Sequence, residues 1–265
     1  MGIRYMDTAP LYGYGLSETR FGEALAGLPR DSFVISTKVG RLLKPSDPSR
    51  SQAGQFRDTP PLEPVFDFSR DAVLRSLEES LKRLRMDHVE IVLIHDPDNH
   101  WEQAINEAYP TLAELRSQGV VKAIGAGMNQ WQMLARFARE GDFDCFLLAG
   151  RYTLLDHSAL PEFLPLCVQK RISIIIGGPY NSGILAEPRE GATFNYTPAP
   201  AHLLQRAQQL QAVCQRHGVP LRAAALQFVL AHPAVATVIP GARSLEEVTD
   251  NVAMVKHPIP AQLWE

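Results

Sequence analysis

The chain has 265 residues, a net charge of −3, 45% hydrophobic residues and 21% charged residues. This length fits one large globular domain or two small ones, and the composition argues against a disordered chain and against a membrane protein. The nearly neutral charge provides no basic surface for nucleic acid or for an anionic membrane.

Three cysteines, Cys145, Cys167 and Cys214, stand among apolar residues without a metal-type spacing. An odd number of cysteines in such surroundings is typical of reduced core residues, so the sequence predicts a cytoplasmic protein without a metal site. No apolar run reaches the length of a transmembrane helix, and the first residues are typical of a strand rather than a signal peptide. The sequence leaves the oligomeric state open.

Short apolar runs alternate with helical patterns along the chain, which predicts β–α units around a parallel sheet. The predicted strands, in chain order, span residues 3–7, 33–38, 89–95, 121–125, 145–149, 172–177 and 236–240. The clearest predicted helices span residues 69–85, 102–117, 202–216 and 221–231. Ser69 is the expected N-cap of the first of these helices.

The first two predicted strands end in charged residues, Asp7 and Lys38, and Tyr12 lies in a Pro- and Gly-containing loop between them. If these strands are parallel and adjacent, an acid, a phenol and an amine meet at their carboxyl ends. The ammonium of Lys38 would then lower the pKa of Tyr12, which is ordinarily about 10, and Asp7 would hold the ammonium in place. The simpler alternative makes Asp7 a turn cap and Lys38 a solvated strand end.

A fourth residue, His95, closes the predicted strand 89–95 and is followed by Asp96-Pro97-Asp98. Catalysis in α/β barrels is concentrated where parallel strands end, and histidine is the side chain that most readily exchanges protons near neutral pH. Asp96 and Asp98 are better explained by a turn before and after proline than by a metal site.

Several motifs, in order along nearly the whole chain, resemble the aldo-keto reductase superfamily. They are Gly2-Ile-Arg-Tyr-Met-Asp7-Thr-Ala-Pro-Leu-Tyr12-Gly, Ser36-Thr-Lys38, Leu81-Lys-Arg-Leu84 with Asp87, Ile94-His95-Asp-Pro97-Asp98, and Val238-Ile-Pro-Gly241-Ala-Arg243 with Asn251. Within the superfamily, Phe66-Asp-Phe-Ser69, Gly125-Ala-Gly-Met-Asn129 and Leu148-Ala-Gly-Arg-Tyr152 are most similar to the D-threo-aldose 1-dehydrogenase (L-fucose dehydrogenase) group.

The resemblance implies an NAD(P)-dependent oxidoreductase on a single (β/α)8 TIM-barrel domain covering residues 1–265. The substrate would be a small carbonyl or alcohol, most simply an aldose oxidised at C1. Tyr12 would be the general acid or base, and Lys38, paired with Asp7, would lower the pKa of Tyr12. His95 would donate a hydrogen bond to the reacting oxygen. Seven predicted strands are one short of a barrel, so we expect the first strand and helix to be missing from this chain, whose C-terminal end is also shorter than is usual for the family.

The resemblance also assigns residues to the cofactor. They are Asn129, Gly178, Tyr180, Gly241, Arg243, Glu247 and Asn251. Ser244 is the expected N-cap of the following helix, with Glu247 completing a capping box. An acid at position 247 would repel a 2′-phosphate, which favours NAD over NADP. Ala149 and Gly177 stand where the family usually has Gln and a stacking aromatic, so Tyr180 is a candidate replacement for the stacking surface.

Three long connections, 40–67, 96–102 and 178–200, are expected to form the rim of the pocket. Trp101 and Trp131 are candidate walls for a sugar, with rim or core packing as the alternative. The pair Gly13 and Gly15 more simply provides a turn beside Tyr12 than a phosphate-binding loop. Two other functions stay open: a barrel enzyme that forms a Schiff base on Lys38, and a family member that binds cofactor without turnover.

Overall fold

The computed structural model describes residues 1–47 and 56–265, which divide into two compact units. One unit, called here the N-terminal unit, contains residues 2–128 and 136–146, and the other, the C-terminal unit, contains residues 1, 129–135 and 147–265. Among the described residues, no helix combines the length and apolarity needed to cross a membrane. In the same ranges, no three His, Cys, Asp or Glu side chains gather in a way that would hold a metal ion.

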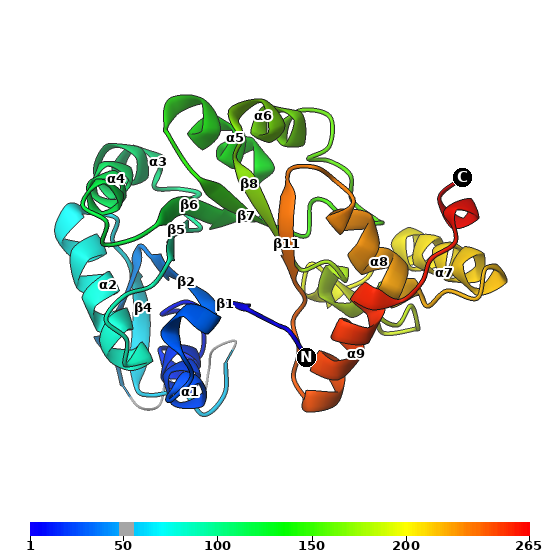
Figure 1. Ribbon diagram of the computed structural model, residues 1–265, viewed down its shortest axis with the longest axis horizontal. Helices are drawn as coiled ribbons and strands as arrows, with labels where there is room; N and C mark the ends of the chain where they lie inside the picture. The colour runs from blue at the N-terminus through cyan, green and yellow to red at the C-terminus, as the bar shows by residue number, and fades with distance from the viewer. Residues whose placement is uncertain (48–55) are drawn as a thin grey trace. The chain divides into compact units, whose positions relative to one another are not determined.

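The N-terminal unit is built from parallel strands with helices in the connections between them, drawn in blue to green in Figure 1. Its elements are β1 (Tyr5–Asp7), α1 (Leu16–Leu25), η1 (Arg30–Ser32), β2 (Val34–Val39), β3 (Arg41–Pro45), β4 (Leu62–Phe66), α2 (Arg70–Leu84), β5 (Ile91–His95), α3 (Trp101–Gln103), η3 (Ala104–Ala108), α4 (Tyr109–Ser117) and β6 (Ala123–Met128). Two elements belong partly to each unit, α5 (Trp131–Glu140) and β7 (Cys145–Ala149).

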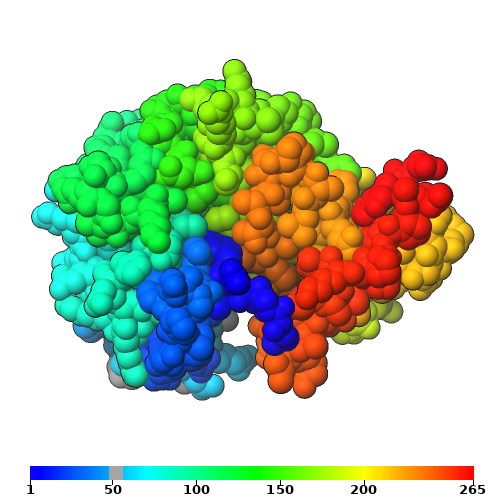
Figure 2. All heavy atoms as spheres, in the orientation of Figure 1, coloured from blue at the N-terminus to red at the C-terminus, as the bar shows by residue number. Residues whose placement is uncertain are grey.

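The C-terminal unit continues the same alternation of strand and helix (Figure 1). Its elements are α6 (Phe163–Lys170), β8 (Ser173–Gly177), η4 (Asn181–Gly183), β9 (Thr193–Phe194), β10 (Thr197–Pro198), α7 (Ala201–Arg216), α8 (Leu221–Leu230), β11 (Val235–Ile239), α9 (Leu245–Lys256) and η5 (Ala261–Trp264). Figure 2 shows α9 and the C-terminal segment, in orange and red, at the surface of this unit, and both carry exposed apolar side chains, Leu245 and Trp264.

The main sheet of the described residues has seven strands in the order β1-β2-β5-β6-β7-β8-β11. The pairings β1–β2, β2–β5, β5–β6 and β8–β11 are all parallel. Parallel strands in sequential order with a helix in most connections confirm the predicted α/β fold of repeated β–α units. All seven predicted strands are present, with ends within about three residues of the prediction.

The long connections contain more structure than the sequence indicated. The connection 40–67 contains the antiparallel pair β3–β4, and the connection 178–200 contains the short antiparallel pair β9–β10. The part of the predicted rim at residues 48–55 lies outside the described residues. The predicted helix 102–117 is divided, because a π-helical stretch, η3, precedes α4 and Pro110 occupies the first turn of α4. Proline fits there because the first turn of a helix needs no N–H donor.

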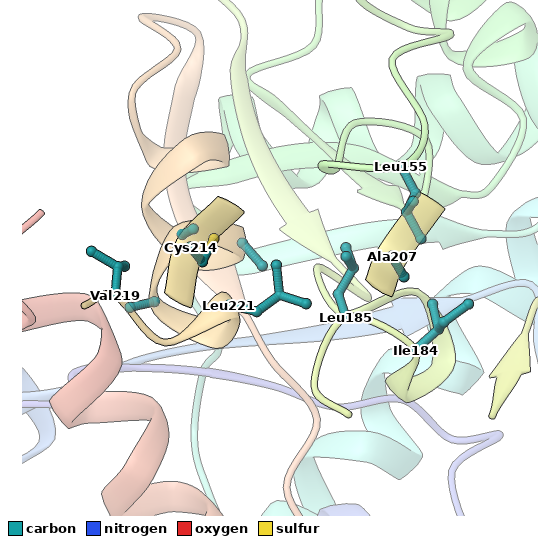
Figure 3. Packing of buried hydrophobic residues seen from close by; sticks show 10 residues of the cluster. Leu155, Ile184, Leu185, Ala207, Cys214, Val219 and Leu221 are labelled. Carbon is teal, nitrogen blue, oxygen red and sulfur yellow. The ribbon is translucent and has the colours of Figure 1, made fainter. Parts of the chain in front are cut away.

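Apolar packing holds the helices of the C-terminal unit together. In the C-terminal unit, a cluster of buried side chains joins the segment after β8 to α7 and α8. Figure 3 shows Ile184 and Leu185 beside Ala207, with Cys214 near Leu221 and Val219. All three cysteines are free and buried, and burial raises the pKa of the Cys145 and Cys167 thiols to about 12. They are therefore unreactive core residues, as the sequence predicted.

Candidate active site

Asp7, Lys38 and His95 lie at the carboxyl ends of three neighbouring parallel strands of the N-terminal unit. Asp7 is the last residue of β1, Lys38 is the last but one of β2, and His95 is the last of β5. The register pairs Asp7 with Ser36 and Lys38 with Leu93, which brings the three ends to one edge of the sheet. The condition set by the sequence, adjacent and parallel strands, is therefore met.

The amine of Lys38 is held by two oxygens of the first strand and its loop. Nζ donates to Asp7 Oδ2 at 2.6 Å and to the Thr8 carbonyl at 2.9 Å. The side chains of Lys38 and Asp7 are only 1% and 6% exposed. Burial by itself would lower the pKa of Lys38, but the charges of Asp7 and Tyr12 together with the hydrogen bonds to them outweigh burial, and the pKa is raised. Lys38 therefore stays an ammonium, which argues against the Schiff-base alternative, because that chemistry needs a neutral amine.

Tyr12 is directed toward this pair by a tight turn. Gly13, Tyr14 and Gly15 all have positive φ, at 62°, 51° and 91°, and α1 begins directly after them. These glycines provide the turn that the sequence predicted. Nζ of Lys38 lies 4.7 Å from the centre of the Tyr12 ring, and the ring of His95 meets that of Tyr12 edge-on at 5.7 Å.

The pKa of Tyr12 is raised above its usual value, although Lys38 itself acts in the predicted, lowering direction. Burial raises the pKa of the phenol, and the positive charge of Lys38 only partly opposes this rise. Asp7 contributes a further rise through its negative charge. The reason for the discrepancy is that the sequence indicated a cationic neighbour but not how deeply the phenol is buried. Without substrate, Tyr12 is therefore a protonated phenol at neutral pH, with Lys38 as the group that stabilises its anion.

His95 is a buried neutral imidazole. It is 5% exposed, and its pKa is lowered well below the usual value by burial, with smaller contributions from the positive charges of Lys38 and Arg41. Within the described part of the chain, its Nδ1 has no hydrogen-bond partner. A neutral imidazole has one donor and one acceptor, so His95 is available to hydrogen-bond a substrate oxygen without bringing a second cation.

Two further charged groups, which no sequence motif marked as part of the site, lie beside His95. Asp96 Oδ2 is 3.6 Å from His95 Nε2 and accepts a hydrogen bond of 2.8 Å from Arg41. The guanidinium of Arg41 also lies 4.5 Å from the centre of the Phe66 ring. Asp96 has a φ of 43°, so its backbone adopts a conformation that only Gly, Asn and Asp tolerate readily. The sequence did offer one indication of this pair, because Arg41 lies just after the strand that carries Lys38.

A pocket of about 510 Å³ opens beside Tyr12 in the same unit. One wall is a face of α1 that includes Leu16, Arg20 and Phe21, and Phe56 and Arg57 form another wall. Trp101 lines a second pocket, of about 440 Å³, together with Asp98 and His100.

The two candidate sugar-binding tryptophans differ in their surroundings. Trp101 is 8% exposed, packs on Phe137 with ring centres 4.5 Å apart, and has the guanidinium of Arg136 over its ring at 3.8 Å. Most of its surface is thus used in packing, which is the alternative that the sequence left open. Trp131 is half-buried at the first residue of α5.

The C-terminal unit contains the residues predicted to hold the cofactor. Asn129 follows β6 and donates from its amide to the Ala149 carbonyl at 3.0 Å. Tyr180 donates its hydroxyl to Asn251 Oδ1 at 2.8 Å, so two of the predicted cofactor residues are joined to each other. Burial raises the pKa of the Tyr180 phenol, with a smaller contribution from Asp250. Gly178 has a φ of 57°, which glycine adopts without strain and which reverses the chain after β8.

The predicted phosphate segment lies between β11 and α9. Ser244 is the N-cap of α9 and accepts a hydrogen bond of 3.2 Å from the Glu247 N–H, as predicted. The Glu247 carboxylate departs from the expected capping box, because it accepts from the N–H and the guanidinium of Arg243, at 2.7 and 3.2 Å, rather than from Ser244. These hydrogen bonds lower the pKa of Glu247. A side chain at Gly241 would meet no atom within 4 Å, so the segment leaves open space there.

Comparison with known proteins agrees with this fold. The model of the aldo/keto reductase family matches residues 1–265. D-threo-aldose 1-dehydrogenase from Pseudomonas sp is 41% identical over 99% of this chain and 82% of its own length. Pyridoxal 4-dehydrogenase from Microbacterium luteolum is 39% identical over 99% of this chain and 82% of its own length. Among solved structures, aldo-keto reductase AKR11C1 from Bacillus halodurans has a TM-score of 0.75 at 26% identity, covering 98% of this chain and 80% of that one.

The chain belongs to the aldo/keto reductase family, and its strands and helices have the family's α/β arrangement. It is an NAD(P)-dependent oxidoreductase. The superfamily suggested by the sequence motifs is therefore confirmed.

Proposed function

We propose that this protein oxidises an aldose at C1, using a nicotinamide cofactor with a preference for NAD. The observation that supports the proposal most directly is the buried ion pair of Lys38 and Asp7 beside Tyr12, with the neutral His95 against the same ring. The 41% identity to a D-threo-aldose 1-dehydrogenase supports the choice of substrate class.

In this proposal each member of the cluster has a separate role. A bound nicotinamide would supply the hydride acceptor for C1 of the sugar. Tyr12 accepts the proton of the C1 hydroxyl, and the ammonium of Lys38 stabilises the phenolate on which that step depends. Asp7 keeps Lys38 charged and in position. His95 hydrogen-bonds the reacting oxygen, and in the reverse direction Tyr12 returns the proton to the developing alkoxide.

Residues of the C-terminal unit fit the chemical requirements of a dinucleotide. The N-terminus of α9 is the positive end of a helix dipole, which attracts phosphate, and the open space at Gly241 lets the backbone approach. The proposal assigns Arg243, Glu247 and Gly241 to the phosphate end and Asn129, Gly178, Tyr180 and Asn251 to the remaining contacts. The carboxylate of Glu247, held on Arg243, supports NAD because it would repel a 2′-phosphate.

The substrate would contact Tyr12 and His95 at the reacting carbon, with Trp101 and Trp131 as further contacts. Asp96 and Arg41 extend this set, because a carboxylate and a guanidinium are suited to hydrogen-bond several sugar hydroxyls. The free, buried cysteines support a cytoplasmic location, where thiols stay reduced.

A steady-state panel tests the proposal. Aldoses, pyridoxal and simple aldehydes or alcohols are assayed with NAD and with NADP, using the wild-type chain and Tyr12→Phe as the matched control. We expect the highest kcat/KM for an aldose with NAD, and a loss of roughly 10²–10⁴-fold in Tyr12→Phe with cofactor binding unchanged. A preference for pyridoxal would reject the aldose, and a fully active Tyr12→Phe would reject the assigned acid–base residue.

A further inference from the structure

A chain of hydrogen bonds continues behind the candidate active site and ends at two residues to which the proposed mechanism gives no role. Ser36 Oγ donates to Asp7 Oδ1 at 2.6 Å, and the hydroxyl of Tyr5 lies 2.7 Å from Ser36 Oγ. On the other side of the same carboxylate, Asp7 Oδ2 accepts from Lys38. The order is therefore Tyr5, Ser36, Asp7, Lys38, with Lys38 beside Tyr12.

The strand register explains why these four side chains meet. Side chains two residues apart in a strand share a face, so Tyr5 and Asp7 face together on β1, as do Ser36 and Lys38 on β2. The two strands are parallel, and Asp7 is the register partner of Ser36. The intervening Thr37 faces the other way and donates to Glu18 Oε1 at 2.6 Å.

The donor order in this chain follows from the number of protons available. Ser36 has a single hydroxyl hydrogen, and its strongest acceptor is Asp7 at 2.6 Å, compared with the Met6 carbonyl at 3.5 Å. Tyr5 must therefore donate to Ser36. Burial and the charge of Asp7 raise the pKa of Tyr5, so its hydroxyl keeps this proton. Ser36 is completely buried, which strengthens its hydrogen bond to a charged acceptor.

We propose that Tyr5 and Ser36 are positioning residues that set the proton affinity of Tyr12 through Asp7 and Lys38. This inference rests on the proposed role of Tyr12 in proton transfer. Ser36 fixes one oxygen of the Asp7 carboxylate and draws off part of its negative charge. The other oxygen is thereby held on Lys38, and less of the Asp7 charge is left to raise the pKa of Tyr12. Removing the Ser36 hydroxyl raises that pKa.

The test measures the titration of Tyr12 in two ways. The first is ultraviolet absorbance of tyrosinate against pH without cofactor, taken as the difference between each variant and the same variant carrying Tyr12→Phe. The second is the pH dependence of kcat with NAD and an aldose. For Ser36→Ala we expect both midpoints to rise by about half to one pH unit. At pH values below the midpoint, the kcat of Ser36→Ala should be several-fold lower than that of wild type, while KM is unchanged.

The chain offers a matched control on the same strand. Thr37 is as buried as Ser36, and its hydroxyl donates to a carboxylate over the same distance, 2.6 Å. Thr37→Val should therefore cost comparable stability, read as Tm, while leaving both midpoints at the wild-type value. Ser36→Thr, which restores the hydroxyl, should return the midpoints toward wild type. Equal midpoints in Ser36→Ala and Thr37→Val would overturn the proposal.

Tyr5→Phe is a second, gentler variant, because it removes one hydroxyl from a half-buried ring. It should raise the midpoint by a smaller amount than Ser36→Ala does. In the double variant it should add no further shift, since Tyr5 acts only through Ser36. If the shifts of the two single variants add in the double variant, Tyr5 does not act through Ser36, and the proposed chain of hydrogen bonds is rejected. Absence of turnover with every substrate, together with the expected absorbance shifts, would reject the proposed function and leave this inference standing.

Discussion

At the scale of single residues, the site is governed by competition between burial and charge. The pKa of Tyr12 is raised because desolvation of the phenolate outweighs its attraction to Lys38. The pKa of Lys38 is also raised, because Asp7 and Tyr12 together outweigh the desolvation of the ammonium. Lys38 is thus kept as an ammonium, paired with Asp7 in a buried place where its field acts on Tyr12 with little screening by water.

Replacing Lys38 by Met should shift the apparent pKa of the rate upward. The variant removes the group that lowers the pKa of Tyr12 and leaves burial and Asp7, which both raise it. The measurement is the pH dependence of kcat. Because Asp7 is left as an unpaired buried charge, the variant should also lose about 3–5 kcal/mol of unfolding free energy.

The double variant Lys38→Met with Asp7→Asn controls for that unpaired charge. It should recover stability, and its apparent pKa should lie below that of Lys38→Met alone, because Asp7 also raises the pKa of Tyr12. Identical pH profiles in wild type and Lys38→Met would mean that the two side chains are not coupled.

At the scale of elements, much of the N-terminal unit could be predicted from the pattern of apolar runs. The strands carrying Asp7, Lys38 and His95 are bounded by charges, glycines and prolines, and such punctuation is readable from sequence. The pairs β3–β4 and β9–β10 were missed because they lie within connections rich in Pro, Gly and Ser, and β9 and β10 have two residues each.

Contacts that depend on register could not be predicted in this way. The bond from Ser36 to Asp7 requires knowing which residues of β1 and β2 stand opposite each other, and the pair Arg41–Asp96 requires knowing how the chain turns after β5. The expectation of one barrel domain lacking its first strand and helix stays a prediction.

Close packing of α1 against α2 yields a prediction at the element scale. A Cβ on Gly22 would lie 2.5 Å from the carbonyl oxygen of Leu84, which is backbone and cannot swing aside. Gly22→Ala should therefore force the helices apart and destabilise the chain by roughly 1–3 kcal/mol, although alanine is the better helix former. Denaturant unfolding measures this, with Glu23→Ala on the exposed neighbouring position as the control. A stabilised Gly22→Ala would show that the two helices separate freely.

The first turn of α9 yields the prediction on cofactor choice. Glu247 now accepts from Arg243. Glu247→Arg removes a repulsive charge and releases Arg243, so the ratio of kcat/KM for NADP to that for NAD should rise by roughly tenfold, the size expected of one charge-assisted hydrogen bond. Glu246→Arg makes the same charge change one residue earlier. If both variants shift the ratio equally, any positive charge in this turn attracts the 2′-phosphate, and Glu247 has no specific role in the choice of cofactor.

At the scale of the whole molecule, the buried neutral His95 makes the stability of the chain depend on pH. The folded state keeps the pKa of His95 well below the usual 6.5, and the unfolded state restores it. Since the folded pKa is the lower one, the stabilising contribution is complete above about pH 6.5 and is lost as the pH falls toward the folded value. Over that range the unfolded chain binds one more proton, which costs about 1.4 kcal/mol of unfolding free energy per pH unit.

His95→Gln removes this proton while leaving the groups that face it, Tyr12, Lys38, Arg41 and Asp96, in place. Below pH 6.5 the unfolding free energy of wild type should therefore fall more steeply than that of the variant, by up to about 1.4 kcal/mol per pH unit, and the two curves should run parallel above it. Burial raises the pKa of Asp96, so protonation of this carboxyl favours the folded state as the pH falls, opposite to the effect of His95. This contribution is the same in both proteins. The pKa values of His157 and His232 are also lowered, and both residues are retained in the variant. Denaturant titrations at a series of pH values measure the difference. Curves that stay parallel through the acid range would mean that folding does not lower the pKa of His95, and burial would then not be what keeps the imidazole neutral.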